Sequence, residues 1–357
     1  MKVAFLGPPG TFGEEAARRH FPGSELLPYQ THGAVARAVE AGEAETGVMA
    51  IENSLNGSVP ETLDILIHET ALKIQGEVLV PVVHNLVAAP GTAIDDIELI
   101  YSHPQALGQC RVFLGQHCPE AQRAAALSTA QAVELAVAQQ GAAAISTVRA
   151  AEIYGADVLA EAIQDQDSNA TRFVVVGRHE PEPSGRDRTS IAFEFAGDRA
   201  GLLTAALTEF SSRGINCTKM ESRPTRATFG EYIFLIDFEG HEFDPECAAA
   251  LDGLRGMTTM LKVFGSYPNR SEYPTNTPSS YLRRFHYDTI LHAPEPLVYL
   301  KDLVGVDRLL MGTDFPFPVQ DLIPLEIYQR AGFTDAEVQA VCYDNCVRLF
   351  KKKESWG

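Results

Sequence analysis

A threonine hydroxyl and an arginine stand side by side at the start of an apolar run in the first half of the chain. The run is Phe173-Val174-Val175-Val176, and Asn169, Thr171 and Arg172 precede it. A hydroxyl can hydrogen-bond an oxygen that leaves a substrate, and an arginine can bind a carboxylate through two parallel hydrogen bonds or hold its own loop. The pair suits an elimination that expels hydroxide from an anionic substrate.

Three other stretches offer groups that bind anions. Thr11-x-x-Glu14, Ser58-x-x-Glu61 and Ser128-x-x-Gln131 have the spacing of a capping box, which begins a helix. A helix N-terminus presents free backbone N–H groups and about half a positive charge. Gly10 and Gly57 lie beside two of these stretches, where glycine permits close approach of a ligand. The alternative for each stretch is a helix cap without a ligand.

The chain as a whole is acidic. Its 357 residues include 47 Asp and Glu against 29 Lys and Arg, a formal net charge of −18. This charge argues against a nucleic-acid partner or an anionic membrane surface. No apolar run approaches the ~18 residues of a membrane span. An anion-binding site in such a protein needs a locally positive pocket, which helix N-termini can supply.

Cysteine usage and the first residues indicate the compartment. The six cysteines form no CxxC pair, and Met1–Gly7 reads as a strand entering a glycine turn, too short for a signal peptide. Free thiols are typical of a reducing environment. We therefore expect a cytoplasmic protein.

Residues 1–180 form the first predicted domain, of α/β type. Short apolar runs alternate there with alanine-rich helical stretches. The run 77–89 is long enough to cross between two lobes. Strands are predicted at 3–6, 46–51, 143–146 and 173–177, and helices at 14–20, 34–41, 60–69 and 130–139.

Two further units follow. After a polar linker at 181–186, residues 188–268 predict strand, helix, strand, strand, helix, strand, the βαββαβ order of a ferredoxin-like unit. Its expected pieces are 189–195, 201–213, 215–222, 231–238, 245–257 and 261–267. A second linker at 269–280 leads to residues 281–357, where a helix is expected near 296–304.

The stretches 7–16, 51–59 and 165–173 together resemble the prephenate dehydratase family. The resemblance implies a two-lobed domain like a type II periplasmic binding protein. It also implies loss of carbon dioxide and hydroxide from prephenate to give phenylpyruvate, with no metal or organic cofactor. Thr171 and Arg172 would be catalytic. The implied substrate-binding residues are Thr11, Asn53, Ser54, Ser58, His103, Gln105, Ser128, Asn169 and Phe173.

Residues 188–268 resemble the ACT domain, a small amino-acid-sensing module. The resemblance implies that phenylalanine binds as a feedback inhibitor in a homodimer or homotetramer. The implied effector residues are Gly201, Leu202, Leu203, Asn216, Glu221, Ser222, Arg223 and Pro224. Leu202 stands where that family usually has alanine.

Residues 281–357 resemble the last two βα units of an amidohydrolase of the carboxymuconate-semialdehyde decarboxylase type. In that family the aspartate of the Gly312-Thr313-Asp314 motif binds a metal. The chain has no His-x-His pair to complete such a site, and a full barrel needs roughly 200 residues or more. We interpret this segment as a partial βα tail without a metal.

Three other functions stay open on sequence alone. Arogenate could replace prephenate as the substrate. A non-catalytic ligand-binding sensor could use the same two-lobed scaffold, although Thr171 and Arg172 argue for catalysis. A metal-dependent amidohydrolase or decarboxylase activity of the tail is disfavoured by the missing histidines.

Overall fold

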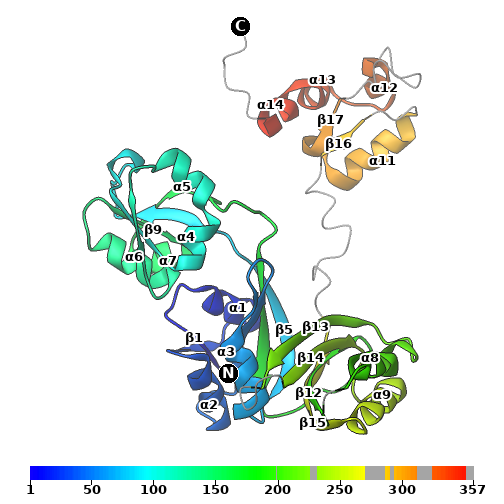
Figure 1. Cartoon of the computed structure of the whole chain (residues 1–357). Helices are drawn as coiled ribbons and strands as arrows, with labels where there is room; N and C mark the ends of the chain where they lie inside the picture. The colour runs from blue at the N-terminus through cyan, green and yellow to red at the C-terminus, as the bar shows by residue number, and fades with distance from the viewer. Residues whose placement is uncertain (198, 226–230, 270–285, 290–292, 312–323, 351–357) are drawn as a thin grey trace. The chain divides into compact units, whose positions relative to one another are not determined.

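The computed structural model describes residues 1–197, 199–225, 231–269, 286–289, 293–311 and 324–350. The chain divides into two compact units, 1–272 and 273–357. Figure 1 shows the elements of each unit. The first unit contains two α/β lobes and the ferredoxin-like unit, and the second contains the tail.

The first lobe is built on a six-stranded sheet in the order β2-β1-β3-β11-β5, with β4 paired to β3. Its core combines β-branched side chains of the strands with alanines of the helices, as expected for strands buried on both faces. The strands are β1 Lys2–Leu6, β2 Glu25–Tyr29, β3 Thr46–Asn53, β4 Gly57–Ser58, β5 Lys73–Pro81 and β11 Ala170–Gly177. The helices are α1 Phe12–His20, α2 His32–Glu40 and α3 Pro60–Asp64, the last continued by a π turn at Ile65–Glu69.

The second lobe is a five-stranded sheet in the order β10-β6-β9-β7-β8. Its strands are β6 Asn85–Ala88, β7 Leu99–Ser102, β8 Gln122–Ala125, β9 Ala142–Ser146 and β10 Asp157–Ala160. Its helices are α4 Pro104–Gln109, α5 Arg111–His117, α6 Thr129–Val137 and α7 Val148–Tyr154, and a 3-10 turn spans Ile94–Asp96. Residues 82–84 and 161–169 connect the two sheets. The predicted crossing run 77–89 is confirmed, with a break at 82–84 where the chain changes sheet.

The ferredoxin-like unit, residues 187–268, has a four-stranded antiparallel sheet in the order β13-β14-β12-β15. The predicted βαββαβ order is confirmed by β12 Asp187–Phe195, α8 Leu202–Ser211, β13 Cys217–Pro224, β14 Tyr232–Glu239, α9 Pro245–Arg255 and β15 Thr258–Pro268. Side chains alternate between the two faces of this sheet. Ile191 and Phe193 pack under α8 and α9, whereas Ala192 joins the core of the first lobe.

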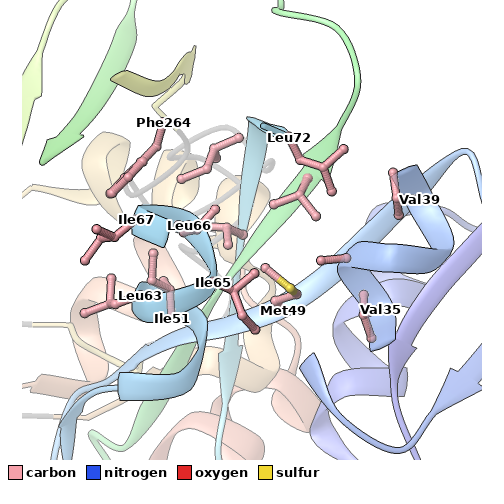
Figure 2. Packing of buried hydrophobic residues seen from close by; sticks show 14 of the residues in the cluster. Val35, Val39, Met49, Ile51, Leu63, Ile65, Leu66, Ile67, Leu72 and Phe264 are labelled. Carbon is pink, nitrogen blue, oxygen red and sulfur yellow. The ribbon is translucent and has the colours of Figure 1, made fainter. Parts of the chain in front are cut away.

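The ferredoxin-like unit and the first lobe therefore share a core. Phe264 and Tyr267 of β15 are both almost fully buried within it. Figure 2 shows Phe264 next to Ile67 and Leu66 of the π turn. Burying an aromatic side chain stabilises by roughly 1.5–3 kcal/mol, so this contact fixes β15 against the lobe.

The second unit retains part of a βα pattern. β16 Tyr287–Asp288 and β17 Leu309–Leu310 pair in parallel, and α11 Pro294–Val304 lies between them in sequence. A 3-10 turn at Val306–Arg308, a π turn at Ala340–Asp344 and three helices complete the described part: α12 Pro324–Arg330, α13 Asp335–Gln339 and α14 Asn345–Phe350. A small core of its own, including Leu297, Leu309 and Tyr328, holds these pieces together.

A pair of carboxyl groups joins the segment after β11 to the ferredoxin-like unit. Glu180 Oε1 and Glu242 Oε1 are buried, and no donor from the described residues reaches either. The two carboxyl groups are hydrogen-bonded to each other, which requires one of them to hold a proton. Burial, together with the hydrogen bond to Glu180 and its charge, raises the pKa of Glu242 to about 7. Burial acts to raise the pKa of Glu180 too, but the bond to Glu242 and the ammonium of Lys73 outweigh it, and that pKa is lowered.

This pair predicts a loss of stability as the pH rises. Between the ordinary pKa of 4.5 and about 7, folded Glu242 holds a proton that the unfolded chain has released. The free energy of unfolding should therefore fall across this window and level off above it. Glu242→Gln should raise the unfolding temperature at pH 8 by about 2–4 °C, the effect of about 1 kcal/mol, and flatten the slope. Thermal unfolding from pH 5 to 8 tests this. The exposed control Glu246→Gln should leave the dependence of unfolding temperature on pH unchanged. The same unchanged dependence in Glu242→Gln would contradict the prediction.

Candidate active site

A cavity of about 1060 Å³ lies between the two lobes of the first unit, and both lobes line it. Its volume is at the upper end of the range of ligand pockets, roughly 300–1,000 Å³. Segments next to the N-termini of five helices contribute to its wall: α1, α2 and α3 from the first lobe, and α4 and α6 from the second. Backbone N–H groups from opposite sides can therefore reach one bound molecule.

Helix termini provide the positive potential of the cavity. None of the lining residues in the part of the chain that the structure describes is Lys or Arg, and Glu134 is the one carboxylate among them. Helices α1, α2 and α6 are each nine residues long, and each carries its N-cap residue, Thr11, Thr31 or Ser128, in the wall. The partial positive charge at such an N-terminus stabilises an anion. The acidic chain can thus bind an anion without a cationic side chain in the pocket.

The three predicted caps have different outcomes. Ser128 is confirmed as a cap: its hydroxyl accepts from the backbone N–H of Gln131 at 3.0 Å. Thr11 occupies the N-cap position of α1, but its hydroxyl donates to the carbonyl of Leu6 at 3.2 Å instead of accepting from the helix. Ser58 was wrongly predicted as a cap, because α3 begins one residue later and its N-cap is Val59.

Thr171 faces the cavity opposite Asn53. The two residues pair across the antiparallel strands β11 and β3, and Asn53 Nδ2 lies 3.0 Å from Thr171 Oγ1. The Asn53 carbonyl oxygen accepts from the backbone N–H groups of Leu55 and Asn56 at 3.1 and 3.0 Å, which orients the amide. Its NH₂ group is therefore the donor to Thr171. Since the Thr171 oxygen accepts this bond, its own proton is available for an oxygen in the cavity.

A chain of amides extends from Asn53 to the other lobe. Asn53 Nδ2 also donates to Asn169 Oδ1 at 2.9 Å, and Asn169 Nδ2 donates to Gln109 Oε1 at 3.0 Å. Asn169 is buried and does not line the cavity, so it supports Asn53 from behind. Gln109 Nε2 donates to Asn56 Oδ1 at 2.9 Å, and Gln109 Oε1 lies 2.8 Å from His84 Nε2.

Gln109, His84 and Asn56 line the cavity and were not predicted from the sequence. Burial lowers the pKa of His84, although its bond to Gln109 opposes the shift. The neutral ring then donates from Nε2 to Gln109. The available signals were a histidine at the break in the crossing run and a glutamine at the end of the helix that His103 begins.

The other predicted residues of the second lobe and of β11 lie in the wall. His103, Gln105 and Phe173 all line the cavity. His103 is the N-cap of α4, where its Nδ1 accepts from the backbone of Gln105 at 3.3 Å, and burial lowers its pKa. Ser54 does not line the cavity: its hydroxyl accepts from the backbone N–H of Ala170 at 3.0 Å and stabilises the turn.

Arg172 is corrected from the expectation that it binds a substrate carboxylate. It does not line the cavity, and it forms ion pairs with Glu52 at 3.4 Å, Glu77 at 3.4 Å and Asp237 at 2.7 Å. The physical reason is strand alternation, because neighbours of Thr171 on β11 face the opposite side of the sheet. The motif residue next to the hydroxyl thus points to the ferredoxin-like unit.

Two of the predicted effector residues are bound within the chain. Glu221 accepts from the Ser58 hydroxyl, and Arg223 pairs with Asp64 of α3 at 2.9 Å. Both side chains of β13 therefore contact the first lobe, and their contact with an effector stays a prediction. Ser222 and Pro224 alternate with them and are exposed.

The remaining predicted effector residues lie at two turns of the ferredoxin-like unit. Gly201 is the N-cap of α8 with a φ of 89°, a conformation that favours glycine, and Leu202 and Leu203 begin that helix. Asn216 precedes β13, and its carbonyl accepts from the backbone of Glu239 at 2.9 Å.

The tail provides no described metal site. Asp314 lies outside the described residues. Within the ranges that the structure describes, no three side chains of His, Cys, Asp or Glu come together as a group that could hold a metal. In those same ranges, no helix has the length and apolar character to cross a bilayer.

Comparisons with known proteins agree with this geometry. A prephenate dehydratase family model matches residues 3–181, and an amidohydrolase model matches 245–352. The second match begins at the first residue of α9, within the ferredoxin-like unit, whereas the second compact unit begins at 273.

Relatives and solved structures cover most of the chain. A bifunctional chorismate mutase/prephenate dehydratase of Neisseria gonorrhoeae is 42% identical over 271 residues, 75% of this chain and 74% of that protein. A prephenate dehydratase of Amycolatopsis methanolica is 40% identical, over 74% of this chain and 88% of its own. The structure of prephenate dehydratase from Arthrobacter aurescens in complex with L-Phe has 36% identity and a TM-score of 0.71, covering 78% of this chain and 94% of that one. This chain belongs to the prephenate dehydratase family.

Proposed function

We propose that the chain converts prephenate to phenylpyruvate by decarboxylative dehydration. The observation that carries the proposal is the Thr171 hydroxyl, which accepts a hydrogen bond from Asn53 and keeps its proton for the cavity. Family membership supports the same reaction. In this reaction the ring carboxylate leaves as carbon dioxide, and its bonding electrons enter the ring. The ring hydroxyl leaves with the electrons of its C–O bond, so a dianion becomes a monoanion, carbon dioxide and hydroxide.

The residues act by positioning and by electrostatic stabilisation. Thr171 donates a hydrogen bond to the departing oxygen as negative charge develops on it. The N-termini of α1 and α6 bind the two carboxylates, and the apolar ring of Phe173 in the wall limits the access of water. Aromatisation of the ring supplies the driving force, and no residue in this scheme forms a covalent bond with the substrate.

Substrate choice between prephenate and arogenate depends on one group, a keto oxygen or an ammonium. Glu134 is the one carboxylate among the described lining residues and would favour an ammonium if it lay near the side chain of the substrate. Comparison of kcat/KM for the two substrates tests the proposal. Higher kcat/KM for prephenate supports it, and turnover of arogenate alone would replace it.

We propose that phenylalanine inhibits the enzyme through the ferredoxin-like unit acting as an ACT domain. Support comes from the Arthrobacter aurescens enzyme, which was solved with L-Phe. The exposed Ser222 and Pro224, with the turn at Gly201, remain as contacts to the amino acid. Strand β13 pairs with β14 alone among the described strands, so its other edge can join a second copy in a homodimer or homotetramer. Calorimetry with phenylalanine and sedimentation of the protein test both points.

The cytoplasm is the compartment that fits this enzyme. All six cysteines are free, and three of them are buried. A reducing environment keeps such thiols unpaired.

Removing the tail is expected to leave the dehydratase intact. The first unit is compact to residue 272 and holds the whole cavity, and the core of the second unit draws on its own residues. A chain that ends at Arg270 should retain its kcat within about 2-fold of the full length and the same response to phenylalanine. Steady-state rates of both forms decide this. Zinc in stoichiometric amount in the full-length protein, lost with an activity on truncation, would instead support a working amidohydrolase module.

A further inference from the structure

A second pair of residues lies directly behind the Thr171–Asn53 pair. Arg172 and Glu52 are paired across β11 and β3 in the next register position, and Arg172 Nε lies 3.4 Å from Glu52 Oε2. Successive side chains of a strand point to opposite faces. Thr171 and Asn53 therefore each have a charged residue as chain neighbour, and that neighbour lies on the face of the sheet away from the cavity.

The ferredoxin-like unit binds both of these charged residues. Asp237 of β14 pairs with Arg172 at 2.7 Å, and Lys219 of β13 pairs with Glu52 at 3.4 Å. Lys219 also donates to the hydroxyl of Ser58 at 2.7 Å, in the wall of the cavity. Strands β14 and β13 of the ferredoxin-like unit thus hold β11 and β3, the two strands that carry the Thr171–Asn53 hydrogen bond.

The bond between Asp237 and Arg172 is buried and charge-assisted. The two side chains are 10% and 11% exposed, so water screens their interaction weakly. Burial alone would lower the pKa of Arg172, but the carboxylates of Asp237 and Glu77 outweigh it and raise that pKa. Glu77 also pairs with Arg188 of β12 at 2.8 Å, which closes the cluster.

We propose that Asp237 is a positioning residue for the dehydration. Asp237 holds Thr171 in place through Arg172, and it transmits to Thr171 any movement of the sheet of the ferredoxin-like unit. The inference rests on the proposed function. A shift of β14 relative to β11 would move the guanidinium of Arg172, whose backbone adjoins Thr171. The 3.0 Å bond from Asn53 would lengthen or turn, and the hydroxyl proton would no longer point to the leaving oxygen. Effector binding that displaces β13 and β14 would then lower kcat.

Asp237→Asn in the full-length protein tests this. Asparagine keeps the size of the side chain, and Arg172 keeps Glu52 and Glu77, so the fold should survive. Deleting Arg172 instead would remove the cation that Glu52, Glu77 and Asp237 share, a costly change even though Lys219 and Arg188 stay beside the first two. We expect kcat to fall about 10-fold, the scale of coupling through such contacts, with KM within about 2-fold of wild type. Maximal inhibition by phenylalanine should also fall while phenylalanine still binds.

Asp64→Asn is the matched control. It removes another ion pair between β13 and the first lobe, that of Arg223 with Asp64 at 2.9 Å, whose side chains are similarly buried. Neither residue of this pair is the strand neighbour of a cavity residue. Its basal kcat should stay at the wild-type value. The inference is overturned if Asp237→Asn keeps the wild-type kcat or raises KM alone. An equal loss of kcat in Asp237→Asn and Asp64→Asn also overturns it.

A second variant covers the case in which Asp237→Asn does not fold. Lys219→Gln removes the parallel pair with Glu52 at a more exposed site, and kcat should fall there too; an unchanged kcat overturns the inference. These outcomes require a wild type that turns over prephenate. A wild type without dehydratase activity refutes the proposed function itself, and the two failures are distinguished in this way.

Discussion

Replacing Thr171 with alanine is expected to lower kcat about 100-fold or more, the cost of removing one hydrogen bond made to the charge of a transition state. Thr171 is half-buried and accepts one bond from Asn53, so the chain should stay folded without it. KM should change little, because the proposed function assigns the carboxylates to the helix N-termini rather than to Thr171. Steady-state rates on a variant with an unchanged circular dichroism spectrum and unfolding temperature test the expectation.

Thr171→Ser and Thr171→Val make the comparison sharper. Serine keeps the hydroxyl and should keep kcat within about 10-fold of wild type, whereas valine keeps the shape and should behave like alanine. A valine variant with wild-type turnover would show that the hydroxyl has no catalytic role. The donor to the leaving oxygen would then have to be another group of the cavity wall.

Asn53→Asp is expected to have the second largest effect, a loss of about 100-fold in kcat/KM. The substitution keeps the shape of the side chain, and the carboxylate still accepts from the backbone of Leu55 and Asn56. Its other oxygen, however, now requires donors where Asn53 donated to Thr171 and to Asn169. The Thr171 proton then turns toward residue 53 and away from the substrate. The added negative charge also opposes a dianion.

Asn56→Asp separates these two effects. Asn56 lines the same wall, and its Oδ1 accepts from Gln109 Nε2 at 2.9 Å, a bond that a carboxylate can keep. The control adds the same charge without contact to Thr171, so KM should rise while kcat stays near wild type. If Asn53→Asp and Asn56→Asp affect kcat equally, Asn53 acts through charge alone and does not direct the hydroxyl.

Motif residues and many of the strands and helices were predictable from the sequence. The face of a strand on which a side chain lies, and the first residue of a helix, were not. Four strands, four helices and the crossing run of the two lobes could be assigned from apolar runs and alanine-rich stretches, and Thr171 was identified from its motif. Strands β2, β4, β7, β8 and β10 and helices α4, α5 and α7 were not predicted. Arg172 could not be placed, because its role depends on which face of β11 points to the cavity. Ser58 was misassigned for a related reason: α3 begins at Pro60, and a shift of one residue gave the cap to Val59.

Contacts between distant segments were also beyond the sequence. Asp237 lies far from Arg172 in the sequence, as Lys219 does from Glu52, and nothing local indicates these pairings. One signal was present, since Asp237 is an acidic residue inside the apolar strand Tyr232–Glu239. A charge in such a strand is buried at a cost unless it is paired. The same reasoning would have indicated Glu77 within the apolar part of β5.

Formation of phenylpyruvate and carbon dioxide from prephenate tests the central claim most directly. Purified full-length protein and its Thr171→Val variant are each incubated with prephenate, and both products are quantified. The proposed function predicts equimolar phenylpyruvate and carbon dioxide with the wild type, and a rate lowered about 100-fold or more with the variant. No phenylpyruvate above the spontaneous rate with the wild type, or equal rates for the two proteins, would contradict it.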